Sequence, residues 1–306
     1  MRRSTMMVAG RMTSFQSCVD ACNTLPTGKL VPLEVAGIQA GEMVEATAEM
    51  LAVYSDVFVF SGRALTLTEA LERGSPAERT EAISTVAASL RDAGVVTGWR
   101  NELVTVAAHF GEPPLFEMER AAYPLLGIAG YGAHVNGFVR DPSAPGGIKL
   151  WVATRSKAKQ TWPGMRDHIV AGQISEGLSP TATVVKECEE EAGIPQDLAA
   201  CAKPAGAVSY KGMDEEGRLK QDVLFVYDLE LPHDFEPVAV DGEVESFELW
   251  TLDRVVALLE GTHDGEPYKP NVALVVIDFL LRQGFISPDE PGYLPLLASL
   301  RSGSFS

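Results

Sequence analysis

Gly172-Gln-Ile-Ser-Glu-Gly-Leu-Ser-Pro-Thr-Ala-Thr-Val-Val-Lys-Glu-Cys-Glu-Glu-Glu-Ala-Gly-Ile194 is the most informative segment of this sequence. Ser179 can accept hydrogen bonds from the free N–H groups at the start of a helix, and Pro180 suits the first helical turn. Gly193 can adopt the left-handed conformation that ends many helices. The segment therefore predicts a loop followed by a helix over residues 179–192.

Three carboxylates lie on one face of this predicted helix. Glu187, Glu190 and Glu191 are related by three and four positions, which brings side chains together on a helix surface. Carboxylate oxygens concentrated in this way are the ligands that Mg²⁺ and Mn²⁺ prefer, together with water and substrate phosphate. A solvated acidic face is the ordinary alternative for so short a pattern, and the surrounding glycines and the strand before them argue against it.

The whole pattern resembles the Nudix box. Its two outer glycines, its basic residue Lys186 and its three glutamates have the spacing of that motif. The general box has Glu at position 178 and Arg at position 186, where this chain has Leu178 and Lys186. Those two side chains support the loop and helix in the general family, so an apolar brace replaces a polar one here. The resemblance implies that Glu187, Glu190 and Glu191 bind the metal, together with the carbonyl of Ala171.

Further segments are similar to one subfamily, the two-domain Nudix proteins often labelled as related to thiamin pyrophosphokinase. The matching stretches are GWRNEL (98–103), ERAAYPLLGI (119–128), YGAHVNGFV (131–139), LWVATRSKAKQTWPGM (150–165), DGEVESFELW (241–250) and KPNVALVVIDFLLRQG (269–284). The resemblance implies a Nudix α/β/α sandwich with a mixed sheet, preceded by a small, uncharacterised α+β domain. It also implies a hydrolase of thiamin diphosphate, or of its damaged oxo and oxy forms, that releases the monophosphate in metabolite damage repair. The name of the subfamily implies a different reaction, the transfer of a pyrophosphoryl group onto thiamin. We discount that reaction because the sequence has no ATP-binding signature.

The chain divides into three parts by pattern. Residues 1–29 are predicted to be a tail or a targeting segment, because the first 20 residues contain Arg, Ser and Thr and only one acid. Residues 30–125 predict a small α+β domain, with helices over 42–54 and from Ser75 to Gly94. Residues 126–306 predict the Nudix domain, where strands at 134–140, 148–155, 205–211, 223–231 and 246–251 accompany helices at 179–192, 252–260 and 270–283.

The remaining candidate site residues lie outside the box. Nudix enzymes commonly use another carboxylate from a later loop, for which Glu243 is the first candidate and Glu245 the second; an exposed turn acid is the alternative. Candidate substrate-binding residues are those that can stack on a ring or bind phosphate: His134, Asn136, Lys157, Trp162, Lys269 and Asn271, with Lys159 as a further cation. A structural histidine, core packing of the tryptophan, solvated lysines and a helix-capping asparagine are the ordinary alternatives.

Composition limits the partners. The chain has 306 residues with 25 basic and 42 acidic side chains, a formal net charge of −17. Such a charge repels nucleic acids and anionic membranes, so we expect neither as a partner. The resemblance implies a small diphosphate substrate, and with the clustered carboxylates it implies a Mg²⁺ or Mn²⁺ cofactor. Four cysteines are too few for a disulfide scaffold and indicate an intracellular, cytoplasmic protein, or an organellar one if residues 1–20 act as a transit peptide. The sequence gives no indication of oligomeric state.

Two other functions are consistent with the same motif. The first is a Nudix hydrolase of ADP-ribose or another nucleoside diphosphate derivative, which the box alone does not distinguish from a thiamin diphosphate hydrolase. The second is a binding module with the Nudix fold and no hydrolytic activity. The intact Glu187, Glu190 and Glu191 argue against the second.

Overall fold

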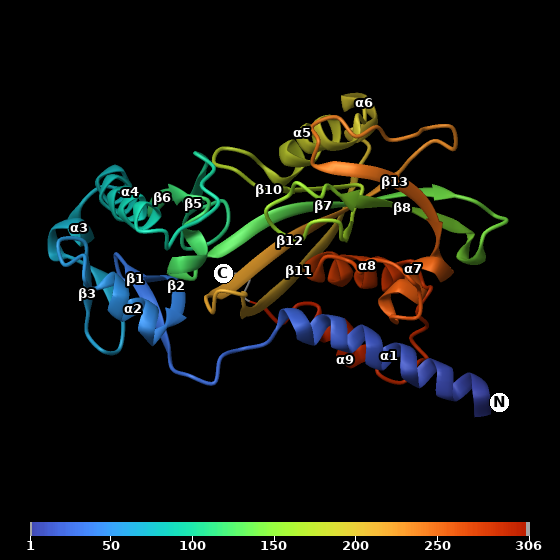
Figure 1. The fold of residues 1–306 in the computed structure, drawn as a ribbon, viewed down its shortest axis with the longest axis horizontal. Helices are drawn as coiled ribbons and strands as arrows, with labels where there is room; N and C mark the ends of the chain where they lie inside the picture. Colours follow the sequence, from blue (N-terminus) through green and yellow to red (C-terminus); the bar gives the residue numbers. More distant parts are fainter. Residues whose placement is uncertain (1, 304–306) are drawn as a thin grey trace.

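The structure is a computed structural model that describes residues 2–303, with side chains from residue 10 onward. The predicted fold class is confirmed: a mixed sheet between helical layers follows a separate α+β domain (Figure 1). Within the described residues, no helix is long and apolar enough to cross a membrane.

Residues 30–128 build the domain at the left of Figure 1 around their own hydrophobic core. A four-stranded sheet in the order β2-β1-β4-β3 is followed by a long helix and a two-stranded hairpin. The elements are β1 (Leu30–Val35), β2 (Ile38–Val44), α2 (Glu45–Leu51), β3 (Phe58–Phe60), β4 (Leu65–Leu67), α3 (Glu69–Arg73), α4 (Pro76–Asp92), β5 (Leu103–Val106), β6 (Phe116–Glu119) and η1 (Tyr123–Leu126).

Helix α4 begins as the sequence predicts. The side chain of Ser75 accepts a hydrogen bond from the N–H of Glu78, and the N–H of Ser75 donates to the Glu78 carboxylate at 2.7 Å. This reciprocal pair satisfies two of the N–H groups that a helix start leaves free. The predicted helix over 42–54 is shorter than expected, because β2 extends to Val44 and pairs with β1.

The second sheet has the order β11-β12-β7-β8-β13, with β10 paired to β7 and β9 paired to β8. Its elements are β7 (Ala129–Arg140), η2 (Pro145–Gly147), β8 (Ile148–Arg155), β9 (Arg166–Asp167), β10 (Val170–Gln173), β11 (Lys203–Met213), β12 (Leu219–Glu230) and β13 (Val244–Thr251). β7 pairs with β8 only at residues 138–140, whereas its residues 132–135 pair with β10. The sheet therefore divides beside β7, between β10 and β8.

Helices cover both faces of this divided sheet (Figure 1). Helices α5 (Pro180–Ala192) and α6 (Gln196–Ala199) lie on one face, and α7 (Leu252–Leu259) and α8 (Pro270–Arg282) lie on the other. Successive side chains of β7 point alternately to the two faces of the sheet. Ala133 and Val135 pack in the core beneath α5, whereas Phe138 packs in the core beneath α8.

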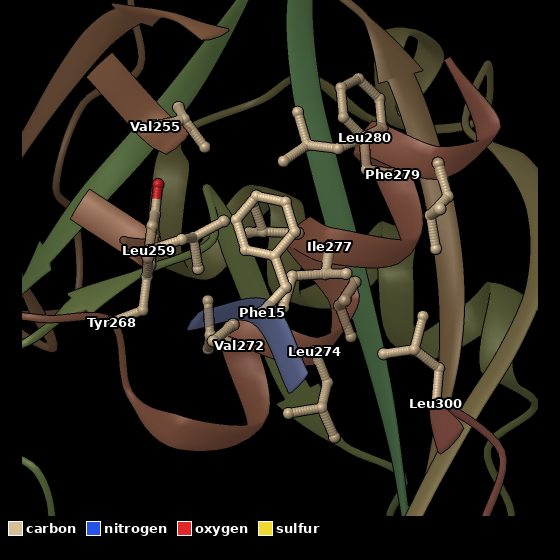
Figure 2. Close-up of a cluster of buried hydrophobic side chains, with 14 of the residues drawn as sticks. Phe15, Val255, Leu259, Tyr268, Val272, Leu274, Ile277, Phe279, Leu280 and Leu300 are labelled. Atoms are coloured by element: carbon tan, nitrogen blue, oxygen red, sulfur yellow. The ribbon is translucent and has the colours of Figure 1, made fainter. Parts of the chain in front are cut away.

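The N-terminal segment is not a loose tail, and this part of the prediction is wrong. Helix α1 (Arg2–Cys22) packs outside α8 and next to α9 (Tyr293–Ser299). Met12, Phe15, Val19 and Cys22 recur at helical spacing and are buried in the core beneath α8, where Phe15 is fully buried. Figure 2 shows Phe15 among side chains of α7 and α8. Burying a phenylalanine side chain stabilises a fold by about 1.5–3 kcal/mol.

Candidate active site

Helix α5 presents its carboxylates because its other face is fixed in the core. Ser179 accepts a hydrogen bond from the N–H of Ala182 at 3.1 Å, and Gly193 ends the helix with a φ of 59°. Val184, Cys188 and Ala192 pack beneath it against the sheet. The remaining face carries Glu187 and Glu191 toward β10, beside the division in the sheet, while Glu190 on the same helix is half exposed.

Glu191 is the most buried of the three. Its side chain accepts a hydrogen bond from the N–H of Ala171 at 3.0 Å, which ties α5 to β10. Burial raises the pKa of Glu191 well above its usual value; the hydrogen bond opposes this shift, and the charges of Asp167, Glu187 and Glu243 add to it. Buried carboxylates that repel one another in this way are a site that a cation stabilises.

Glu187 lies directly against β10. A Cβ atom added to Gly172 would be 2.4 Å from Cγ of Glu187 and 2.6 Å from its Cδ. Only glycine lets the strand approach this side chain so closely, which explains the first glycine of the box. Burial raises the pKa of Glu187, Lys186 opposes the shift, and Glu190 and Glu243 add to it.

Glu190 is turned further toward solvent than its neighbours. Its side chain is 50% exposed and pairs with Lys186 at 2.9 Å. The same ammonium group is 3.1 Å from Glu187. Lys186 therefore neutralises part of the charge on this helix face in the metal-free arrangement.

Glu243 comes to the site from the other side of the sheet division. It precedes β13, its carbonyl accepts from the N–H of Ser156 at 2.8 Å, and its carboxylate pairs with Lys159. Its charge acts on both Glu187 and Glu191. Glu245, the second candidate, is nearly half exposed and lies 3.9 Å from the ammonium of Lys157.

The donor set suits a hard divalent cation. Glu187 and Glu191 supply carboxylates whose pKa the charge of Glu243 raises, Glu243 supplies a third carboxylate, and Ala171 supplies a carbonyl beside Glu191. As the side chains stand in the described part of the chain, no three His, Cys, Asp or Glu residues are close enough together to hold an ion. To bind a metal ion, the carboxylate side chains must therefore rotate toward one another. Glu190 must then leave Lys186, and Glu243 must leave Lys159.

A second group of polar residues lies on the α8 side of the sheet, and we call it the polar cluster. Four of its members influence one another's charge: His134, Asp167, His168 and Lys269. Asn136 and Asn271 join it through third residues, namely Asp228, whose charge also acts on His168, and Tyr210, which donates to Asp222. The rings of His134 and His168 are 5.1 Å apart. Asn136 donates to Asp228 at 3.0 Å, and Asn271 donates to the hydroxyl of Tyr210 at 3.4 Å. The cluster adjoins the box glutamates through Asp167, whose charge acts on Glu191.

Several buried atoms of the polar cluster have no partner among the described residues: Nδ1 of His134, Oδ1 of Asn136, Nε2 of His168 and Oδ1 of Asn271. The described residues also offer no ion-pair partner to the Lys269 ammonium, whose pKa is lowered by burial, although Asp167 and Asp222 oppose this. Burial lowers the pKa of His134 well below its usual value, and that of His168 to about 4. Buried polar atoms in proteins almost always have hydrogen-bond partners, so these exceptions indicate a ligand or bound water.

The structure thus brings four predicted substrate residues together and leaves two apart. His134, Asn136, Lys269 and Asn271 belong to the polar cluster, and Asn271 contacts Tyr210 rather than capping α8. Lys157 is 82% exposed. Trp162 is half-buried in the loop between β8 and β9, where its carbonyl accepts from Arg155 at 2.9 Å.

Sequence reasoning missed Asp167 and His168. Both are buried, and Asp167 pairs with Arg155 at 2.6 Å. Their position directly before the apolar pair Ile169 and Val170 was the available signal, because two ionisable residues next to a buried strand need a partner or a function.

Comparison with known proteins identifies the family. A family described as NUDIX domain matches residues 130–272, and a domain of unknown function (DUF4743) matches residues 14–130. The chain is 42% identical over 303 residues to "Nudix hydrolase 20, chloroplastic" of Arabidopsis thaliana, covering 95% of this chain and 78% of that protein. The chain belongs to the Nudix hydrolase family.

Other Nudix proteins match to differing extents. "Nudix hydrolase 24, chloroplastic" of the same plant is 42% identical over 300 residues, covering 96% of this chain and 80% of its own length. A MutT/nudix family protein from Enterococcus faecalis superposes on 55% of this chain and 67% of its own, with 12% identity and a TM-score of 0.38. Nudix hydrolases generally use a divalent metal ion.

Proposed function

We propose that this Nudix hydrolase cleaves thiamin diphosphate, or its oxidised oxo and oxy forms, to the monophosphate and phosphate. The catalytic carboxylates are Glu187, Glu190, Glu191 and Glu243. The observation that carries the proposal is the polar cluster, because its unpartnered atoms adjoin the box glutamates through Asp167.

Each part of the site has a role in diphosphate hydrolysis. Glu187, Glu190, Glu191 and the Ala171 carbonyl, with Glu243 as a further carboxylate, would hold a Mg²⁺ ion, which would neutralise phosphate oxygens and lower the pKa of a bound water. Lys269 offers an unpaired ammonium to a phosphate group. Lys186, which lies beside Glu187 and Glu190, adjusts the charge at this face of the helix.

The atoms of the polar cluster that lack a hydrogen-bond partner among the described residues also select the organic part of the substrate. Oδ1 of Asn136 is oriented as an acceptor, because Nδ2 of the same side chain donates to Asp228. Oδ1 of Asn271 is a second free acceptor. Two buried acceptors suit a ring that carries an amino group, such as an aminopyrimidine. An adenine ring also carries one, and the segments that resemble the thiamin-related subfamily favour the aminopyrimidine of thiamin.

A hydrolysis screen with Mg²⁺, in which the monophosphate products are separated and quantified by chromatography, tests the substrate. The substrates are thiamin diphosphate, its oxo and oxy forms, ADP-ribose and NADH, and a Glu191→Gln preparation controls for contaminating phosphatases. We expect the highest kcat/KM on the oxidised thiamin diphosphates. Equal values for intact and oxidised forms contradict a repair role. If kcat/KM is higher on ADP-ribose or NADH, that compound is the substrate instead of thiamin diphosphate. If no compound is hydrolysed, the result favours a binding module.

Targeting by residues 1–20 is a separate proposal, prompted by the chloroplastic names of the two relatives. Burial of Met12, Phe15 and Val19 in the core favours retention of residues 10–22 in the folded protein. Microscopy of the full chain fused at its C-terminus to a fluorescent reporter, with and without residues 1–29, tests the targeting role. An unchanged location contradicts it.

A further inference from the structure

The N-terminal domain contacts the Nudix box directly. Residues 174–179, which we call the box loop, join β10 to α5. Their backbone is attached on both sides: the N–H of Ile174 donates to the carbonyl of Tyr131 at 2.9 Å, and the N–H of Glu176 donates to the carbonyl of Leu103 at 3.2 Å. Tyr131 belongs to β7, whereas Leu103 is the first residue of β5 in the N-terminal domain. The loop before the catalytic helix is therefore bonded to both domains.

A side-chain contact reinforces this backbone bond. The hydroxyl of Ser175 in the box loop donates to the carboxylate of Glu102, which lies directly before β5. The guanidinium of Arg120, directly after the neighbouring strand β6, pairs with the same carboxylate at 2.5 Å. Burial opposes ionisation of Glu102, but Ser175, Arg120 and Lys186 outweigh it, so its pKa lies below the ordinary value. Glu102 is thus held as a charged acceptor between the hairpin and the box loop.

The box of this chain lacks one acidic side chain of the general motif. Position 178, where the general motif has Glu, is Leu178, and it packs against the core beneath α5. The charge of Glu102 reaches Lys186, which contacts Glu187 and Glu190. An acid from the other domain therefore acts on the same basic side chain of the box.

The N-terminal domain is also attached elsewhere, so loss of one contact leaves it in place. The hydroxyl of Tyr123 donates to Asp222 at 3.0 Å, and the amide of Gln221 donates to the carbonyl of Gly127 at 2.6 Å. Lys211 pairs with Glu42. Substitution of Glu102 consequently tests the box-loop contact rather than attachment of the whole domain.

We propose that the N-terminal domain holds the box loop in its catalytic geometry, and that Glu102 is the positioning residue for this contact. Glu102 acts through Ser175 and Glu176 and does not touch the reacting atoms. The proposal gives a role to the domain of unknown function (DUF4743), and it rests on the box glutamates being the catalytic site.

The test is a double-mutant cycle in the full chain. The variants are Glu102→Gln, Ser175→Ala and the two combined, and Glu112→Gln is the matched control because Glu112 is exposed in the loop of the same hairpin. Steady-state kinetics use thiamin diphosphate, or the diphosphate that replaces it in the screen, with saturating Mg²⁺. Hydrogen exchange of the Glu176 amide is measured without substrate or metal, and melting temperatures check folding.

We expect each single variant to lower kcat by about tenfold with little change in KM, because positioning errors act on the chemical step. The double variant should be no slower than either single one, since both substitutions break one contact. Exchange of the Glu176 amide should accelerate by about fivefold or more in both single variants. Glu112→Gln should behave as wild type.

The proposal is overturned by single variants within twofold of wild-type kcat, by a double variant whose loss is the product of the single losses, or by unchanged exchange at Glu176. An equal loss in Glu112→Gln also overturns it. The Glu191→Gln variant separates the two proposals. If it keeps full activity, the catalytic site is elsewhere, and the exchange measurement alone then decides whether Glu102 holds the loop.

Discussion

Replacing Gly172 with alanine tests whether the position of Glu187 sets the rate. The backbone of Gly172 lies outside the left-handed region, so alanine can adopt it without strain. The new Cβ would be 2.4 Å from Cγ of Glu187, whereas ordinary contact begins at 3.4 Å. Glu187 must therefore withdraw by about 1 Å, and a displacement of about 1 Å at a catalytic group can lower the rate by on the order of 10²-fold.

Stability should change much less than the rate in this variant. The obstructed atoms belong to a flexible side chain, so we expect a destabilisation below about 1 kcal/mol. Phosphate release gives kcat, and melting curves give the stability. Gly28→Ala is the control, because nothing lies within 4 Å of a Cβ at that position. A Gly172→Ala variant with kcat within about threefold of wild type would refute the reasoning, and a large fall in melting temperature would show a structural role instead.

Three further predictions concern ionisable residues. Glu191→Gln keeps the side chain's shape and removes one repelling charge, so the stability of the protein without metal should not fall. Its kcat should fall by about 10²-fold or more. A collapsed melting temperature without metal would contradict this prediction. Lys269→Met should raise KM for the diphosphate by about tenfold without lowering the melting temperature, because a partly buried ammonium that pairs with no carboxylate of the described residues is costly to fold; unchanged KM would exclude phosphate contact. Burial lowers the pKa of His168 from 6.5 to about 4, so stability on the order of 3 kcal/mol is lost as pH falls from 6.5 through 4. Urea titrations should show a flatter pH dependence in His168→Gln, and an identical one would contradict the assignment.

The helix with the box glutamates was predictable because its signals are local. Ser179, Pro180 and Gly193 set its ends, and the glutamates follow from its period. The same holds for α4 with its capping pair. Local signals also place His134 and Asn136 on one face of the predicted strand at 134–140, since alternate residues of a strand point the same way.

Contacts between distant segments were not predictable in this way. The apolar residues of α1 have helical spacing, but Arg11, Thr13 and Ser14 lie between them and weaken the pattern. Val44 ends a strand rather than continuing a helix because β1 pairs with it across the sheet. Glu102 meets Ser175 only once the two domains have packed, 73 positions apart in the chain. Such contacts depend on tertiary structure, which no local pattern encodes.

Packing of α1 outside α8 has a consequence for synthesis on the ribosome. Phe15 is made well before its partner helix, which begins only at Pro270. At about 5–20 residues per second, roughly 10–50 s pass between the two. During that interval the N-terminal domain can fold, while the apolar side of α1 has no partner to cover it. The emerging chain is therefore a candidate for chaperone binding at residues 12–22 until its C-terminal helices leave the ribosome.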